Sequence, residues 1–219
     1  MQAGKEITGT GLKLAQEDDL KVLAKALSQN ERVVLENRQL HRFLFRHIRW
    51  TKKASDRERD GMFIKTLEMK PPQLAVFKLC SSWKIMEVFS LLGLPGFIAK
   101  ENEKIYAQSG AFMAILAPGI RPQDFVAAGR RLQRVWLTAA KLGLSAQPLA
   151  GIVLLYQKIQ QQNSPELSPA HVTRIKAAYR QAASIFKSGS QTITFILRIG
   201  RAQAPSAVSP RYILEKIIT

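Results

Sequence analysis

The chain has 219 residues, 46% of them hydrophobic, so we expect a folded core of one-domain size and not a disordered chain. It carries 33 Lys and Arg against 16 Asp and Glu, and the formal net charge of +17 leaves open an ordinary basic surface or a dedicated polyanion-binding protein. The single cysteine, Cys80, excludes an intramolecular disulfide, and no apolar run approaches the roughly 20 residues that span a bilayer. We therefore expect a cytoplasmic protein without a membrane span.

The N-terminal part of the chain is predicted to be mainly helical. A short strand at 9–16 precedes a helix that begins at Asp18 or Asp19, and a second helix is predicted from about Glu31 to Trp50. Basic residues recur along the second helix at three- and four-residue spacings, as one stripe: Arg38, Arg42, Arg46, Arg49 and Lys53. The stripe is either an anion-binding face or a solvated face opposite the apolar residues Leu40, Phe43, Leu44 and Ile48.

Turn and proline signals divide the middle of the chain. Residues 54–72 are predicted to be a loop, because a charge cluster is followed by an Asp60-Gly61 turn signal and by two prolines. A helix is predicted over 73–92, with Cys80 in it as a buried and inert thiol, and a shorter helix over 97–108.

The C-terminal half alternates strands and helices. A buried strand is predicted at 111–118, a long amphipathic helix at 122–142, an extended segment at 145–151 and a helix at 151–163. Ser168 and Pro169 predict the start of another helix, and β-branched and aromatic residues predict a strand at 192–200. The tail is predicted to be extended, with room for a short helix at its end. The pattern predicts an α+β fold with a small buried sheet covered by helices, in which some sheet partners are missing.

Motifs for metal binding and for hydrolysis are absent from the sequence. The three histidines, His41, His47 and His171, do not have the spacing of ligands on one helix face, and there is no HExxH, CxxC, GxSxG or GKS/T pattern. An enzyme of this sequence would therefore depend on a bound cofactor and not on a nucleophile or metal of its own.

Residues 128–151, AGRRLQRVWLTAAKLGLSAQPLAG, carry the most informative pattern. They resemble the helix-to-loop passage GxxxQxxxLxAxxLGLxxxP of the nitroreductase family. The matching positions, in order, are Gly129, Gln133, Leu137, Ala139 or Ala140, Leu142, Gly143, Leu144 and Pro148. The end of the chain, ILRIGRAQAPSAVSPRYILEKI, is similar to the closing pattern of that family, and the weaker resemblance covers roughly residues 18–217.

The resemblance implies a fold, a cofactor and an activity. It implies a single nitroreductase-like domain over 1–219, with a small central sheet between helices in three α/β/α layers. It also implies a homodimer that binds FMN, takes hydride from NAD(P)H and reduces nitro or quinone-type small-molecule acceptors, with no catalytic side chain of its own. The FMN-binding positions it implies are Pro148, Leu149, Ala150, Gly151, Ser209 and Arg211.

Two of these positions have an implied role. The resemblance puts the backbone of Gly151 beside the redox edge of the flavin, where a missing side chain permits close approach, and puts Arg211 on the phosphate. From the residues alone, Gly151 is simply a helix or turn boundary and Arg211 is one more surface arginine, and without the resemblance these interpretations are favoured.

The chain departs from the family in its N-terminal part. The Arg-x-Ser-x-Arg and Ser-x-x-Asn-x-Gln-Pro-Trp elements that bind FMN in the family are absent, Ala150 stands where some members have glutamate, and Tyr212-Ile213 replaces Arg-Pro. We expect either a fragment that begins at an internal methionine or a shortened protein that has lost much of its cofactor site.

The alternative function is a non-catalytic basic module for nucleic acid or acidic partners. It rests on the net charge and the basic stripe, without a recognised nucleic-acid motif and without aromatic residues interleaved among the basic ones.

Overall fold

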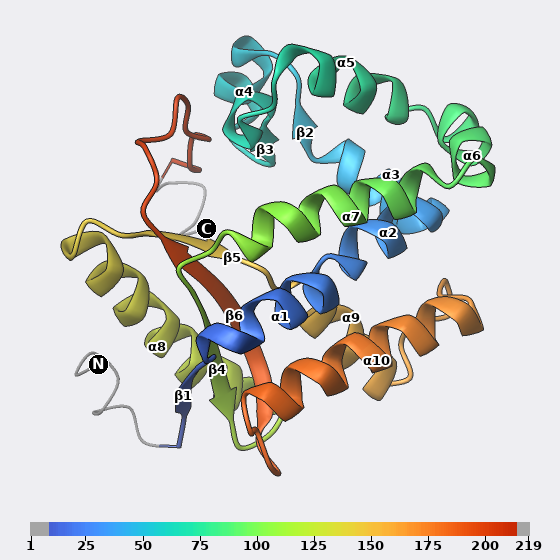
Figure 1. The fold of residues 1–219 in the computed structure, drawn as a ribbon. Coiled ribbons are helices and arrows are strands. Elements are labelled where there is room, and N and C mark those ends of the chain that lie inside the picture. Colours follow the sequence, from blue (N-terminus) through green and yellow to red (C-terminus); the bar gives the residue numbers. More distant parts are fainter. Residues whose placement is uncertain (1–8, 214–219) are drawn as a thin grey trace. The chain divides into compact units, whose positions relative to one another are not determined.

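The computed structural model describes residues 9–213, and the chain divides into two units (Figure 1). Unit 1 comprises Met1–Val33 and Gly96–Ala202, and unit 2 comprises Val34–Pro95 and Gln203–Thr219. The chain passes from one unit to the other within α2 (Gln29–Glu36), within α7 (Leu94–Ala107) and again between Ala202 and Gln203. Each unit has its own sheet, so each is described separately.

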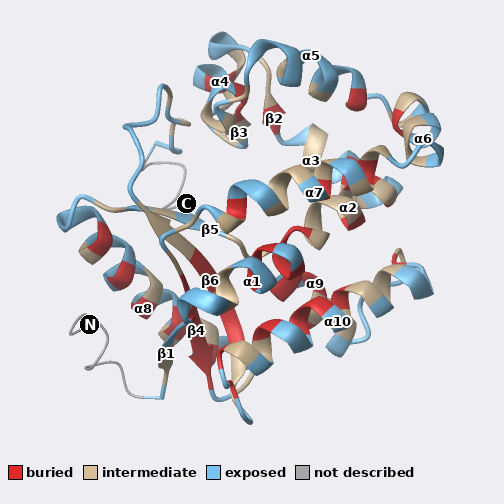
Figure 2. Cartoon of the chain, in the orientation of Figure 1, coloured by how far each residue is buried: buried red, intermediate tan, exposed pale blue. Residues whose placement is uncertain are grey.

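Unit 1 is built on a four-stranded antiparallel sheet. Its order is β1 (Gly11–Leu14), β4 (Ala111–Ala117), β6 (Thr192–Gly200) and β5 (Ser145–Pro148). The central strands β4 and β6 are rich in apolar residues, and Phe112, Ile115 and Ile196 are completely buried (Figure 2). The strands predicted at 111–118 and 192–200 and the short N-terminal strand are confirmed. The apolar runs of β4 and β6 suit strands that are covered on both faces.

Helices cover both faces of this sheet. Figure 1 shows α8 (Pro122–Lys141) on one side and, on the other, α1 (Leu20–Leu27) and α10 (Pro169–Ile185). Helix α9 (Gly151–Gln160) packs on β6 and on α10, and the 3₁₀ turn η2 (Glu17–Asp19) leads into α1. Helix α10 begins as predicted, with Ser168 Oγ accepting a hydrogen bond from the N–H of His171 at 3.2 Å.

Unit 2 consists of short elements around a small apolar cluster. Its strands β2 (Ile48–Arg49) and β3 (Met62–Phe63) form a parallel pair. Its helical elements are α3 (Arg38–Arg46), α4 (Lys52–Glu58), the 3₁₀ turn η3 (Ile64–Leu67), α5 (Pro71–Cys80) and α6 (Trp83–Leu91). The buried residues Ile48, Phe63 and Ile64 form the cluster, and partly buried side chains such as Phe45 and Phe77 pack against it.

Three predictions for this part of the chain were wrong. The helix predicted over 31–50 is interrupted at Asn37, whose extended backbone (φ −109°, ψ 118°) lets its Oδ1 accept hydrogen bonds from the N–H groups of Gln39 and Leu40, both at 3.0 Å. The loop predicted over 54–72 contains α4, β3 and η3, and Thr51 Oγ1 caps α4. The helix predicted over 73–92 is broken at Ser81 and Ser82. In the first two cases the side chain of a capping residue starts a new helix inside a pattern that periodicity alone reads as continuous or irregular, whereas Ser82 before α6 makes no such capping hydrogen bond.

The observed fold class is α+β, as predicted, with the antiparallel sheet in one unit and the small parallel pair in the other. Between residues 9 and 213 no helix has the length and apolar character needed to cross a bilayer. The same residues contain no cluster of three or more His, Cys, Asp or Glu side chains arranged to hold a metal ion. The single domain over 1–219 stays a prediction, and the short helix predicted at the end of the tail lies outside the described residues.

Candidate functional site

Residues 148–151 form a tight turn between β5 and α9, here called the 148–151 turn. Pro148 pairs with Leu197 of β6, and the N–H of Leu149 donates to the carbonyl oxygen of Ile196 at 2.9 Å. Ala150 is the N-cap of α9, and no side chain caps this helix. Because the first N–H groups of a helix have no partner inside the helix, the turn presents hydrogen-bond donors and the positive end of the helix dipole.

Gly151 accommodates the side chain of Asn30. A Cβ at Gly151 would overlap Oδ1 and Cγ of Asn30, so any larger residue requires the Asn30 side chain to move. Gly151 is not among the glycines with positive φ, so its missing side chain, and not its backbone freedom, is what this position uses. In this structure Asn30 makes the close approach at Gly151, and the approach of a flavin ring stays a prediction.

Polar side chains connect the two ends of the turn. Tyr106 Oη donates to Oε1 of Glu31 at 2.8 Å, and the guanidinium carbon of Arg198 lies 5.2 Å from the centre of the Tyr106 ring. Arg198 also donates from Nε to Oε1 of its cross-strand neighbour Gln147 and from Nη1 to the carbonyl oxygen of Ile105, the latter at 3.2 Å. The contacts run from Gln147, just before the turn, through Arg198 and Tyr106 to Glu31. Asn30, next to Glu31 in the sequence, contacts Gly151, the last residue of the turn. We call Asn30, Glu31, Tyr106, Gln147 and Arg198 the polar cluster.

Within the polar cluster Tyr106 is buried and Glu31 and Arg198 are partly buried, whereas Gln147 is exposed, and the burial shifts the pKa values of Tyr106, Glu31 and Arg198. Burial raises the pKa of Glu31, although hydrogen bonds from Tyr106, from the backbone and from the Asn30 side chain act in the opposite direction. Its Oε2 is buried and makes no hydrogen bond to any residue that the structure describes. Burial, followed by the charge of Glu31, raises the pKa of Tyr106 far above its usual range. Burial also lowers the pKa of the Arg198 guanidinium, so the cluster combines an acid, a phenol and a cation in a partly desolvated environment.

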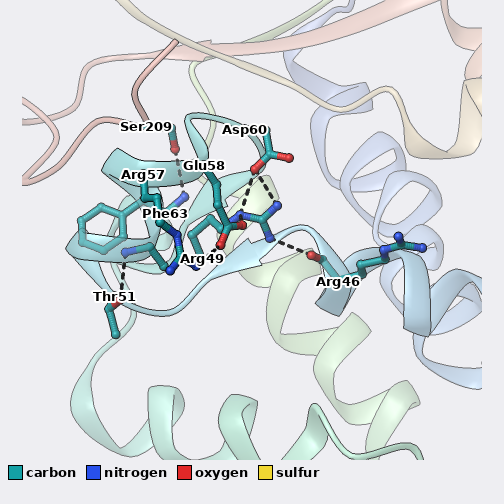
Figure 3. A network of polar contacts seen from close by, with 9 residues as sticks. Arg46, Arg49, Thr51, Arg57, Glu58, Asp60, Phe63 and Ser209 are labelled. Carbon is teal, nitrogen blue, oxygen red and sulfur yellow. Dashed lines mark hydrogen bonds and ion pairs between the residues drawn. The ribbon is translucent and has the colours of Figure 1, made fainter. Parts of the chain in front are cut away.

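The other two predicted FMN-binding residues, Ser209 and Arg211, belong to unit 2. Ser209 Oγ accepts a hydrogen bond from the N–H of Phe63 at 2.9 Å (Figure 3). Nearby, Ser206 donates to the carboxylate of Glu68 from its N–H at 2.7 Å and from its hydroxyl at 3.0 Å. These bonds give Ser209 a structural role within unit 2, while Arg211 is exposed. The predicted positions thus fall into two groups: 148–151 in unit 1, and Ser209 with Arg211 in unit 2.

Sequence reasoning missed the polar cluster. Arg198 has a signal in the sequence, since it is a charged residue inside the apolar strand Thr192–Gly200, and such residues are rarely placed there without a partner. Glu31 and Tyr106 have none. They are 75 residues apart along the chain, and only the tertiary fold brings them together.

The basic stripe predicted over Arg38–Lys53 does not exist as one surface. Arg38, Arg42 and Arg46 share α3, whereas Arg49 lies in β2, where its guanidinium is 2.6 Å from Oε2 of Glu58 and 2.5 Å from Oδ1 of Asp60 (Figure 3). Phe43, expected on the apolar face, is instead 66% exposed. The chain turns between Arg46 and Arg49, so the helical spacing that joined them in the prediction is lost.

Comparisons with known proteins give a distant relationship and no family. No family model matches the chain. A curated relative, the uncharacterized protein MT1398 of Mycobacterium tuberculosis, is 23% identical over 207 residues, which cover 93% of this chain and 28% of that protein. The chain thus spans little more than a quarter of the length of this relative.

Proposed function

We propose that the chain is a nitroreductase-like flavoprotein, in which FMN mediates the NAD(P)H-dependent reduction of nitro or quinone-type acceptors. The observation that supports it best is the 148–151 turn. Residues 148–151, which the resemblance assigns to FMN, lead into an uncapped helix N-terminus, and the partly buried Arg198 contacts Gln147, the residue that precedes the turn. The sheet of unit 1, covered by helices on both faces, is also compatible with the three-layer fold that the resemblance implies.

The donors around the turn suit the chemistry of a flavin. The carbonyl oxygens and ring nitrogens of isoalloxazine accept hydrogen bonds, and the backbone N–H groups at the start of α9 and the Arg198 guanidinium donate them. In this proposal the backbone of Leu149–Gly151 and the side chain of Arg198, all in unit 1, would hold the ring. The assignment of the phosphate end to Arg211 and Ser209 rests on the resemblance alone. Bound FMN would supply the hydride chemistry, while the chain binds, orients and shields it from water. The homodimer and the use of NAD(P)H rest on the resemblance alone.

The proposal is tested by FMN binding to the full chain and to an Arg198→Gln variant. Because a hydrogen bond from a charged donor contributes about 1.5–3 kcal/mol, the variant is expected to bind FMN at least about tenfold more weakly. The visible spectrum of added FMN and its quenched fluorescence measure binding, and circular dichroism checks folding. The control is Arg180→Gln, which removes an exposed arginine of α10. A full chain that takes up no FMN, or an Arg198→Gln variant that binds as tightly as its parent, contradicts the proposal.

A second experiment separates the two explanations for Gly151. Gly151→Ala is expected to destabilise the protein, because the new methyl group meets Asn30, and the double variant Asn30→Ala/Gly151→Ala is expected to regain that stability. If the ring approaches Gly151, the double variant still binds FMN more weakly than Asn30→Ala alone. Equal FMN affinity of the double variant and Asn30→Ala would assign Gly151 to the packing of Asn30 and not to the flavin.

A further inference from the structure

Helix α3 is fixed within unit 2 by one face. Asn37 caps its N-terminus, and the Nε2–H of His41 donates to the carbonyl oxygen of Cys80 at 2.7 Å. The ring of His41 lies 5.2 Å from that of Trp83, and the ring of Phe45 lies 4.9 Å from that of Phe77. These contacts come from the face toward α5 and α6, so the remaining surface of α3 has a defined orientation within unit 2.

The face beside this packed one carries three exposed arginines, Arg38, Arg42 and Arg46. The helix contains no acidic residue, and none of the three guanidinium groups forms an ion pair with any residue from 9 to 213. Figure 3 shows the side chain of Arg46 pointing away from Glu58 and Asp60, although its carbonyl oxygen accepts a hydrogen bond from Arg49 at 2.7 Å. Like charges four residues apart disfavour a helix, so this stripe is an unfavourable arrangement that a bound anion would compensate.

An aromatic pair lies beside the arginines. Phe43 is three residues before Arg46 and is therefore its neighbour on the helix surface, and the ring centre of Phe43 is 4.4 Å from that of His47. Nδ1 of His47 donates to the carbonyl oxygen of Phe43 at 2.7 Å, which fixes the imidazole at the end of the helix. We call Arg38, Arg42, Phe43, Arg46 and His47 the α3 surface. It combines a row of cations with an exposed ring.

We propose that the α3 surface binds single-stranded nucleic acid, with the arginines on consecutive phosphates and a base stacked on Phe43. Residues four apart on a helix are about 6 Å apart along its axis, so the three arginines form a row that can follow a phosphate backbone. An exposed aromatic ring favours a single strand over a duplex, because only unpaired bases offer a free face for stacking. A membrane surface fits less well, since an interfacial helix needs a wide apolar face and Phe43 is the single large apolar side chain that is exposed on α3. This binding surface is separate from the proposed flavin site and does not depend on it.

The charge part of the proposal is tested with a fluorescently labelled oligothymidylate and the full chain. Each phosphate contact on a single strand contributes about −0.7 to the slope of log K against log salt, so three contacts contribute about −2. The triple variant Arg38→Gln/Arg42→Gln/Arg46→Gln is expected to lose most of its affinity and to reduce the slope by about that amount. All three side chains are exposed, and circular dichroism confirms that the variant is folded.

The matched control removes the same charge elsewhere. Arg130 and Lys141 are exposed residues of α8, and Arg180 is an exposed residue of α10, all in unit 1. The triple change of these residues to Gln is expected to leave the salt slope unchanged. Equal losses of affinity and slope in the two triple variants would overturn the proposal, because binding would then depend on net charge alone.

The stacking part is tested with Phe43→Leu. This change keeps every charge but removes the aromatic face, and it is expected to lower oligothymidylate affinity at least about fivefold while the salt slope stays the same. Unchanged affinity, or tighter binding of a duplex than of the single strand, would overturn the single-strand assignment. Binding of vesicles rich in anionic lipid that disappears in the arginine variant, without oligothymidylate binding, would overturn it in favour of a membrane surface.

Discussion

The two units use arginine in different ways. In unit 1, Arg198 stands in the central strand β6, half-buried against the ring of Tyr106. In unit 2, Arg49 holds two carboxylates beside a small apolar cluster, while Arg42 on the neighbouring helix is exposed without an ion pair to any described residue. The net charge of the chain is therefore not a single property. Among its arginines, Arg198 is half-buried in unit 1, Arg49 belongs to an ion-pair network in unit 2, and Arg42 beside that network is exposed.

The units also differ in what holds them together. The central strands of unit 1 bury complete apolar side chains on both faces, whereas the cluster of unit 2 is smaller and is completed by ion pairs and aromatic contacts. This contrast predicts that unit 1 responds most to the loss of apolar volume, and unit 2 to the loss of polar partners.

The largest effect is expected from Ile196→Ala. Ile196 is completely buried in β6, and removing a buried isoleucine side chain to Cβ costs about 2–5 kcal/mol of unfolding free energy, partly through the cavity that remains. Denaturant unfolding measures the loss, and hydrogen exchange should locate it in β4 and β6. Leu137→Ala on the exposed side of α8 is the control, with an expected change within about 0.5 kcal/mol. A loss below 1 kcal/mol for Ile196→Ala would contradict the apolar basis of unit 1.

A smaller effect is expected from Arg49→Gln in unit 2. The substitution removes the cation between Glu58 and Asp60 and leaves both carboxylates close together, which should cost about 1–3 kcal/mol. Amide hydrogen exchange is expected to become faster in β2, α4 and β3 and to stay the same in β4. An Arg42→Gln variant, which breaks no ion pair, should change neither the free energy of unfolding nor the hydrogen exchange of β2, α4 and β3. If Arg49→Gln and Arg42→Gln have equal effects, the distinction between paired and unpaired arginines is wrong.

The smallest effect is a change in pH dependence from Glu31→Gln. Because burial raises the pKa of Glu31 above its ordinary value of 4.5, the folded protein binds this proton more tightly than the unfolded chain. Its contribution to stability is complete below the ordinary pKa and is lost as the pH rises to the raised pKa. Glutamine keeps an acceptor for Tyr106 but has no proton to lose, so the variant should gain stability relative to its parent across this pH window. Denaturant unfolding at a series of pH values measures the difference, and identical pH profiles would contradict the desolvation of Glu31.

The sequence predicts unit 1 better than unit 2. Strand Thr192–Gly200 and helix Pro169–Ile185 were identified because long periodic or β-branched segments are bounded by clear signals such as Ser168-Pro169. Unit 2 consists of elements too short for periodicity. Its divisions depend on single capping residues, Asn37 and Thr51, which look like ordinary polar positions until the backbone conformation is known.

The sequence predicts one part of the candidate site, the 148–151 turn, but not the side chains around it. The resemblance selected the 148–151 turn, but the side chains around it come from distant parts of the chain, and no spacing relates Glu31 to Tyr106 or Tyr106 to Arg198. The exposure of Phe43 was missed for a related reason. Its position was deduced from a continuous helix to Trp50, and the interruption at Asn37 and the turn after Arg46 change which side chains pack against the apolar cluster.

The buried position of Cys80 has a practical consequence. It is the only cysteine in the sequence, it is 1% exposed, and burial raises the pKa of its thiol, so little reactive thiolate is available at neutral pH. A cysteine introduced on the surface, for example in place of the exposed Leu137 or Val88, would therefore be the dominant target for a maleimide dye or a spin label. The 219-residue chain can therefore carry a single introduced label without removal of Cys80.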